Sequence, residues 1–202
     1  MCMSIALGSV VGADFLFVLL LYVILTISYS LRLKRLVIVD CLTLAALYTL
    51  RIISGAEAVS LQLSFWLLAF SVFIFLSLAF AKRYAEIVVQ SDEGKSAVSG
   101  RGYLISDALV LQVMGVSSGY ISALVVALYL RSDDVVFLYT EPMVLWFQIP
   151  LLLFWISWVW LKAARGQMHD DPIVFAIKDH ASLLVVGLSF IMLLCAATGL
   201  GM

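Results

Sequence analysis

Long apolar runs separated by short polar connections constrain this chain more than any other feature. A helix needs about 20 apolar residues to cross the hydrocarbon core of a bilayer, and such runs recur along the whole sequence. The 202 residues are 64% hydrophobic and 12% charged, with a mean hydropathy of +1.14. A soluble domain of this size does not carry that balance. We therefore predict an integral membrane protein, all-α, folded as a polytopic transmembrane helix bundle, and we do not expect nucleic acid as a partner.

The runs predict about seven helical segments that form one domain over residues 1–202. They cover residues 1–11 (a partial segment), 13–30, 37–57, 62–82, 104–130, 142–163 and 181–200. Residues 1–11 are too short to span, and they lack the basic start of a signal peptide. We therefore expect that the chain begins partway through a helix and is truncated at its N-terminus.

Basic residues predict how the segments are oriented. The connections at 32–35, 82–103 and 162–179 fall on one side of the membrane, and those near 58–61 and 131–141 fall on the other. Ten of the lysines and arginines lie on the first side, whereas Arg131 lies on the second. By the positive-inside rule the first side is cytoplasmic. We expect a multi-pass protein of the inner, cytoplasmic membrane whose polar site faces the cytoplasm.

Three polar side chains interrupt the segment at 37–57. Asp40 and Arg51 are eleven residues apart, which brings them within about 20° of one helix face but about 16 Å apart along the axis. Tyr48 falls on the same side. Since Asp40 and Arg51 cannot reach each other, each needs a partner on another helix, a ligand or water. The alternative is an interfacial Asp40 neutralised by Arg32 or Lys34, with Arg51 snorkelling or paired with an acid such as Asp107 or Asp14.

A second polar cluster ends the next apolar segment. It consists of Lys82, Arg83, Tyr84 and Glu86, in which Lys82 and Glu86 are spaced to pair across one helical turn. Alone, it reads as an ordinary interfacial anchor. Together with the first group it gives tyrosine, cations and carboxylates on the same side of the membrane. That combination suits a phosphate or a metal–diphosphate group, because cations match its charge and acids hold Mg²⁺.

Two other features have plainer explanations. Asp171, followed by Pro172, is a good helix N-cap and predicts a short helix through about Asp179. His169 and Asp170 supply two potential metal ligands without a third at helical spacing. The three cysteines, Cys2, Cys41 and Cys195, lie in apolar runs at unrelated spacings, so we interpret them as packing residues.

Several stretches together resemble the UbiA superfamily of membrane transferases. They are "YSLRLKR" from Tyr29, Asp40, "LAALYTLRIISG", "LSFWLLAFSVFIFLSLAFAKRYAE" and "MHDDPIVFAIKD". Within the superfamily the chain is most similar to the decaprenyl-phosphate phosphoribosyltransferase branch, since Lys82, Arg83 and Glu86 stand where many members carry a DxxxD motif. The first aspartate-rich motif of the family, NDxxDxxxD, is absent, in line with the expected truncation.

The resemblance implies a fold, a reaction and a set of site residues. The fold is a bundle of usually nine helices, and the reaction transfers phosphoribose from phosphoribosyl diphosphate to a polyprenyl phosphate with Mg²⁺. The expected partners are an isoprenoid lipid, membrane lipids and the phosphorylated donor. The bundle of this family surrounds a cavity that is capped on the cytoplasmic side. The catalytic residues would be Asp40 and Arg51, with Arg51 supporting that cavity from below. The ligand-binding residues would be Tyr29, Lys34, Tyr48, Lys82, Arg83 and Tyr84, and Glu86 would contact the metal.

Three alternatives remain open from the sequence. The first is an enzyme of the same superfamily that moves a polyprenyl chain from its diphosphate to an aromatic acceptor. The second is a truncated membrane protein without catalytic activity. The third is a transporter, which is disfavoured because the sequence shows neither repeated halves nor paired Gly/Pro interruptions.

Overall fold

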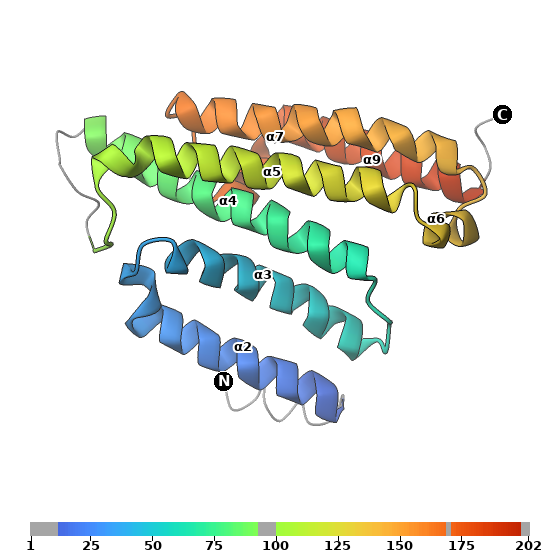
Figure 1. Cartoon of the computed structure of the whole chain (residues 1–202), viewed down its shortest axis with the longest axis horizontal. Coiled ribbons are helices and arrows are strands. Elements are labelled where there is room, and N and C mark those ends of the chain that lie inside the picture. Colours follow the sequence, from blue (N-terminus) through green and yellow to red (C-terminus); the bar gives the residue numbers. More distant parts are fainter. Residues whose placement is uncertain (1–11, 93–99, 169–170, 199–202) are drawn as a thin grey trace.

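Within the residues that the structure describes, six helices are long and apolar enough to cross a membrane. A computed structural model describes residues 12–92, 100–168 and 171–198. In these residues the spans are α2 (Ala13–Leu31), α3 (Val39–Ala58), α4 (Phe65–Asp92), α5 (Ala108–Tyr129), α7 (Gln148–Ala164) and α9 (His180–Thr198). They run side by side with alternating direction, as Figure 1 shows. The expectation of an all-α transmembrane bundle is confirmed, and the partial segment at 1–11 lies outside the described residues.

Short helices complete the connections. The structure has η1 (Leu33–Arg35), η2 (Ile105–Asp107), α6 (Asp133–Leu138), η3 (Pro142–Phe147) and α8 (Pro172–Lys178). The expected short helix after Asp171 is α8, and the Asp171 side chain accepts a hydrogen bond from the Ile173 backbone N–H at 3.1 Å. The predicted N-cap is therefore confirmed.

One predicted boundary was wrong by ten residues. We expected the helix at 62–82 to end at the basic cluster, with a long polar loop from 82 to 103. Instead, α4 continues to Asp92, so that Lys82, Arg83 and Glu86 are helical. The helix continues because Ala85, Ile87 and further apolar residues alternate with the charged ones and give the extra turns a face to bury.

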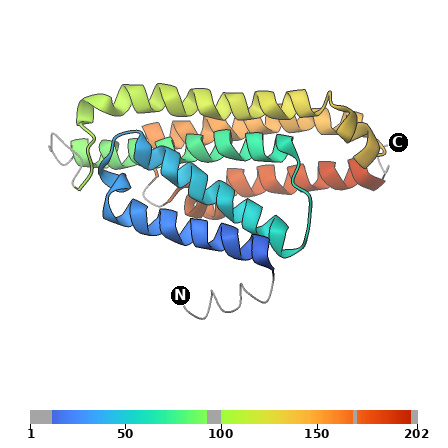
Figure 2. The same cartoon turned by 60° about the horizontal axis from the view of Figure 1, so that its bottom comes forward.

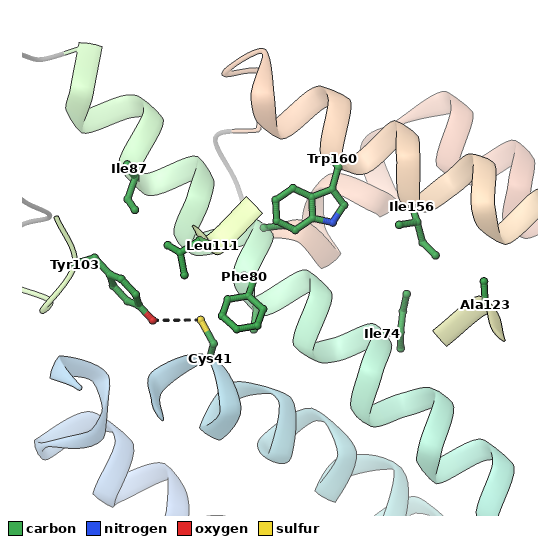
Figure 3. Packing of buried hydrophobic residues seen from close by; sticks show 11 residues of the cluster. Cys41, Ile74, Phe80, Ile87, Tyr103, Leu111, Ala123, Ile156 and Trp160 are labelled. Carbon is green, nitrogen blue, oxygen red and sulfur yellow. Dashed lines mark hydrogen bonds between the residues drawn. The ribbon is translucent and has the colours of Figure 1, made fainter. Parts of the chain in front are cut away.

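The centre of the bundle is the contact among α4, α5 and α7. A stripe of small residues on α5, namely Gly115, Ser118, Gly119, Ser122 and Ala123, is buried and lets α4 and α7 approach closely. In Figure 3, Phe80 and Ile74 of α4 lie opposite Trp160 and Ile156 of α7. The Trp160 indole N–H donates to Ser77 Oγ at 3.1 Å, which satisfies a buried donor without water.

The polar connections separate into two ends of the bundle. The C-terminal ends of α2, α4 and α7 lie toward the left in Figure 1, and the connections between α3 and α4 and between α5 and α7 lie at the right end. Figure 2 gives the same arrangement from another direction, with α2 at the edge of the bundle. No residue of α2 is buried in the described structure. The left end, called the basic end here, carries most of the predicted site residues, whereas Tyr48 and Arg51 lie further along α3.

Gly115 provides a test of the close packing. A Cβ atom there would lie 2.1 Å from Trp160 Cζ2 and 2.8 Å from Phe80 Cβ, both in the middle of the core. Overpacking of this kind costs about 1–3 kcal/mol. We expect Gly115→Ala to lower the melting temperature of the detergent-solubilised protein by several degrees in a thermal unfolding scan. Gly187→Ala on α9 is the matched control, because a Cβ there meets no atom within 4 Å. Equal melting temperatures for the two variants would contradict the packing described.

Candidate functional site

A buried ion pair joins α3 to α4 at the basic end. Asp40 and Arg83 are 0% and 1% exposed at their side chains, and Arg83 Nε lies 2.8 Å from Asp40 Oδ2. The two atoms are in ion-pair contact but are not aligned for a hydrogen bond. Arg83 also contacts Glu86 one turn further along α4. The sequence predicted a partner for Asp40 on another helix, a ligand or water, and the partner is Arg83 of α4. The alternative, in which Arg32 or Lys34 neutralises Asp40, is not what the structure shows.

The other oxygen of Asp40 is held by Tyr103. The Tyr103 hydroxyl donates to Asp40 Oδ1 at 2.5 Å and accepts the Ile38 backbone N–H at 2.8 Å. Cys41 Sγ lies 3.6 Å from the same hydroxyl, the contact drawn as a dashed line in Figure 3. Tyr103 comes from the connection between α4 and α5, so it ties that connection to the start of α3.

Arg101, from the same connection, completes a network of four charges. Its Nε lies 3.0 Å from Glu86 Oε2, and its Nη1 lies 3.7 Å from Asp40 Oδ2. The Tyr29 hydroxyl of α2 accepts from Arg83 Nη2 at 3.3 Å and from Arg101 Nη1 at 3.4 Å. We call these residues the Asp40–Arg83 network; its members are Tyr29, Asp40, Arg83, Glu86, Arg101 and Tyr103. Two arginines and two carboxylates make it electrically neutral in its present form.

The backbone around the network is strained. Ile38 has φ 68° and ψ −44°, and the Val39 N–H donates to the Val37 carbonyl at 2.8 Å. This is the geometry of a classic γ-turn, which is rare for a β-branched residue. Gly102 passes so near that a Cβ there would lie 2.7 Å from the Arg35 carbonyl oxygen. Strain of this kind persists only where neighbouring contacts hold it, and Tyr103 supplies that contact.

Lys82 lies beside the network and pairs with a different helix than predicted. Its Nζ is 2.5 Å from Asp171 Oδ2, the carboxylate that also caps α8. The expected Lys82–Glu86 pair does not form, because Glu86 is engaged by the two arginines. The Lys82–Asp171 pair brings α8 onto α4 from the far part of the sequence. Both side chains keep some exposure, 31% and 25%, so this cation remains reachable.

Arg51 and Tyr48 form a second polar group deeper along α3. Arg51 Nη2 and Nε donate to the Tyr22 hydroxyl at 2.8 and 3.2 Å. The guanidinium lies 5.3 Å from the Tyr48 ring centre and 5.5 Å from that of Tyr22. The Tyr48 ring in turn stacks on Phe75 of α4 at 5.2 Å. The alternative in which Arg51 pairs with an acid such as Asp107 or Asp14 is not seen in the described residues, where Asp107 instead accepts from the Leu104 N–H at the start of η2.

Two predicted ligand-binding residues lie apart from these groups. The Tyr84 ring packs edge-on against Trp160 with centroids 5.8 Å apart, on the α7 side of α4. Lys34 lies in η1 at the basic end and takes part in none of the ion pairs of the described residues. Conversely, Arg101 and Tyr103 were missed. They sit in a polar segment, "GRGYLISD", whose loop conformation has no periodicity from which a contact could be derived.

The carboxylates of the site show whether its residues fit the expected Mg²⁺. Within the described ranges, no three His, Cys, Asp or Glu side chains are grouped to hold a metal. Mg²⁺ bound to substrate phosphates needs only one or two protein carboxylates. Asp40 has both oxygens engaged and no exposure, whereas Glu86 is 31% exposed. Glu86 therefore fits as a single ligand to a metal carried by a diphosphate, and Asp40 fits as the positioning counter-charge of Arg83.

A cavity of about 740 Å³ lies toward the other end of the bundle. Its wall comes from α4, α5, α7 and α9 and is mostly apolar, with Trp66, Phe70 and Trp155 among the aromatic side chains. Phe70 precedes Arg83 by thirteen residues on α4, so about 20 Å of helix separates this wall from the network. The bundle thus has a charged end and an apolar cavity toward its opposite end.

The buried pair leads to a stability prediction. Arg83→Met would leave the Asp40 charge buried without its main partner, which costs about 3–5 kcal/mol. We expect a large fall in melting temperature for Arg83→Met and partial recovery in the double variant Asp40→Asn/Arg83→Met, measured by thermal unfolding. Arg131→Met, at an exposed position of the opposite end, is the control. If the effects of Asp40→Asn alone and Arg83→Met alone on the free energy of unfolding simply add in the double variant, Asp40 and Arg83 are not coupled.

Tyr103 leads to a pH prediction. Burial, and then the hydrogen bond to Asp40, raises the pKa of the Tyr103 phenol above its usual 10.0. The folded state therefore favours the neutral phenol, and its contribution is complete below pH 10 and is lost as the pH rises above that value. We expect the melting temperature to fall more steeply between pH 9 and 11 for the wild type than for Tyr103→Phe. Identical slopes would contradict a buried, neutral Tyr103.

Comparison with known proteins gives two relatives that match most of this chain. No protein family model matches the chain. It is 36% identical over 186 residues to the uncharacterized protein y4nM of Sinorhizobium fredii and 32% identical over 185 residues to the nodulation protein NoeC of Azorhizobium caulinodans. The matches cover 91% and 89% of this chain, but only 36% and 60% of the two relatives. The chain therefore spans between about a third and three fifths of the length of these relatives.

Proposed function

We propose that this protein is a UbiA-type membrane transferase that moves phosphoribose from phosphoribosyl diphosphate to a polyprenyl phosphate. The observation that carries the proposal is the Asp40–Arg83 network with Lys82 beside it, at the basic end of a transmembrane bundle. Five of the residues expected from the resemblance gather there, namely Tyr29, Asp40, Lys82, Arg83 and Glu86. Guanidinium and ammonium groups at a membrane boundary are suited to a diphosphate.

The reaction needs charge stabilisation more than a protein base. A phosphate oxygen of the lipid attacks C1 of the ribose, the bond from C1 to the diphosphate oxygen breaks, and pyrophosphate leaves with the electron pair. Arg101 and Lys82 are the partly exposed cations that would bind the diphosphate. Asp40 and Tyr29 would hold Arg83 and Arg101 in position. Mg²⁺, when bound through Glu86, would supply further neutralisation of the leaving group.

The membrane arrangement supports the same assignment. The basic end would face the cytoplasm of a bacterial inner membrane, where a water-soluble sugar phosphate donor is available. The apolar cavity between α4, α5, α7 and α9 would accept part of the isoprenoid chain. An isoprenoid lipid, surrounding membrane lipids and the phosphorylated donor are thus the proposed partners.

Activity measurement tests the proposal directly. The purified protein in nanodiscs, given phosphoribosyl diphosphate, polyprenyl phosphate and Mg²⁺, should release pyrophosphate and form a lipid-linked phosphoribose. We expect Arg101→Gln and Lys82→Gln to lower the rate by about tenfold to a hundredfold, because each removes a charged hydrogen bond to the leaving group. Arg131→Gln, at the opposite end, should keep the wild-type rate.

The same assay separates the alternatives. Pyrophosphate released from a polyprenyl diphosphate in the presence of a phenolic acceptor, and none from phosphoribosyl diphosphate, would indicate prenyl transfer instead. Absence of transfer with either donor, in protein that is folded by its melting curve, would refute a catalytic role for this chain. Wild-type rates in both Arg101→Gln and Lys82→Gln would refute the assigned site.

A further inference from the structure

Arg51 carries a positive charge inside a membrane span. It is twelve residues from Val39 and seven from Ala58, so it lies about 18 Å and 10 Å along the axis from the two ends of α3. A guanidinium at such a depth is costly, and such groups normally face a cavity, a partner or a ligand. The position therefore calls for a compensating group.

The contacts of Arg51 in the described residues are neutral. Two of its five N–H groups contact the Tyr22 hydroxyl, and the rings of Tyr22 and Tyr48 lie beside the guanidinium. No carboxylate of the described chain lies within ion-pair distance of it. Asp171 acts on Arg51 electrostatically from further away, but its carboxylate is already paired with Lys82 at 2.5 Å. The cation is thus exposed on the bundle and contacts two aromatic side chains but no carboxylate of the described residues.

The group is nevertheless held in a defined place. Tyr48 is fixed by its stacking on Phe75 of α4, and Tyr22 comes from α2, so three helices position one guanidinium. The remaining N–H groups present a planar fork, the geometry that matches two oxygens of a phosphate. A lysine would supply the charge without the fork. Side chains on a helix lean toward its N-terminus, which on α3 is the basic end.

We propose that Arg51, Tyr22 and Tyr48 form an intramembrane site for a phosphomonoester carried by an isoprenoid lipid, separate from the Asp40–Arg83 network. The inference deepens the proposed function, because it assigns the acceptor phosphate to Arg51 and leaves the diphosphate donor to Arg101 and Lys82. The surroundings favour a lipid-borne phosphate, since a free anion would have to leave water to reach this depth. Asp171, which pairs with Lys82, also acts electrostatically on Arg51.

Direct binding measurements test the proposal without requiring turnover. The probes are farnesyl phosphate, farnesol, inorganic phosphate and phosphoribosyl diphosphate, each titrated against the purified protein in nanodiscs. We expect the wild type to bind farnesyl phosphate more tightly than farnesol. Arg51→Gln should weaken farnesyl phosphate binding about tenfold or more and leave farnesol binding unchanged, because only a charge-assisted contact is lost. Arg51→Lys should recover part of the loss, and Arg131→Gln should behave as the wild type.

Each outcome decides the assignment. Unchanged farnesyl phosphate affinity in Arg51→Gln, equal losses for farnesyl phosphate and farnesol, or no preference for the phosphate in the wild type would overturn it. Inorganic phosphate that binds as tightly as farnesyl phosphate and depends equally on Arg51 would replace the lipid by free phosphate as the ligand. Phosphoribosyl diphosphate binding should be lost in Arg101→Gln and retained in Arg51→Gln. If the protein binds farnesyl phosphate through Arg51 but does not bind or use that donor, the proposed transfer fails and the lipid phosphate site stands.

Discussion

The buried Asp40–Arg83 pair is the interaction on which the basic end of this bundle depends. Two opposite charges that are buried away from water stay together, because separating them would leave each charge unpaired in a low-dielectric surrounding. Their contact therefore fixes the rotation of α3 relative to α4. Tyr103 and Arg101 then attach the α4–α5 connection to the same carboxylate, so that one aspartate organises three segments of the chain.

Different interactions hold α4 at different points: close packing against small residues near its middle, and ion pairs toward the basic end. Toward its middle, Gly115 and Gly119 of α5 let the helices approach closely, and close packing of this kind is one way in which helices associate where water is absent. Toward the basic end, the same helix turns Arg83 to the interior and Lys82 to α8. A rigid packed centre thus holds the charged side chains at one end and an apolar cavity at the other.

Much of this architecture follows from the sequence, and the exceptions have definite causes. Helix length and hydropathy predicted the spans, and Asp171 before Pro172 predicted the start of α8. The membership of Asp40, Arg83 and Glu86 in one polar group was also anticipated. The partner of each charge was not, since Lys82 reaches a carboxylate 89 residues away and Tyr103 enters from a loop without periodicity. Local spacing constrains which side chains share a face, but tertiary contacts select their partners.

The neutrality of the network limits how it can receive a ligand. Two arginines that already face two carboxylates attract an anion weakly, because any approaching phosphate also meets Asp40 and Glu86. A complex that brings both signs, such as a diphosphate with a divalent cation, avoids this cost. In such a complex Glu86 would contact the cation in place of Arg101, and Arg101 would contact a phosphate oxygen in place of Glu86. The number of ion pairs would then be unchanged. Asp40 and Arg83, fully buried, would remain paired throughout. In the proposed function the partly exposed residues, Glu86 and Arg101, would therefore bind the donor. The buried pair of Asp40 and Arg83 would hold these residues in position.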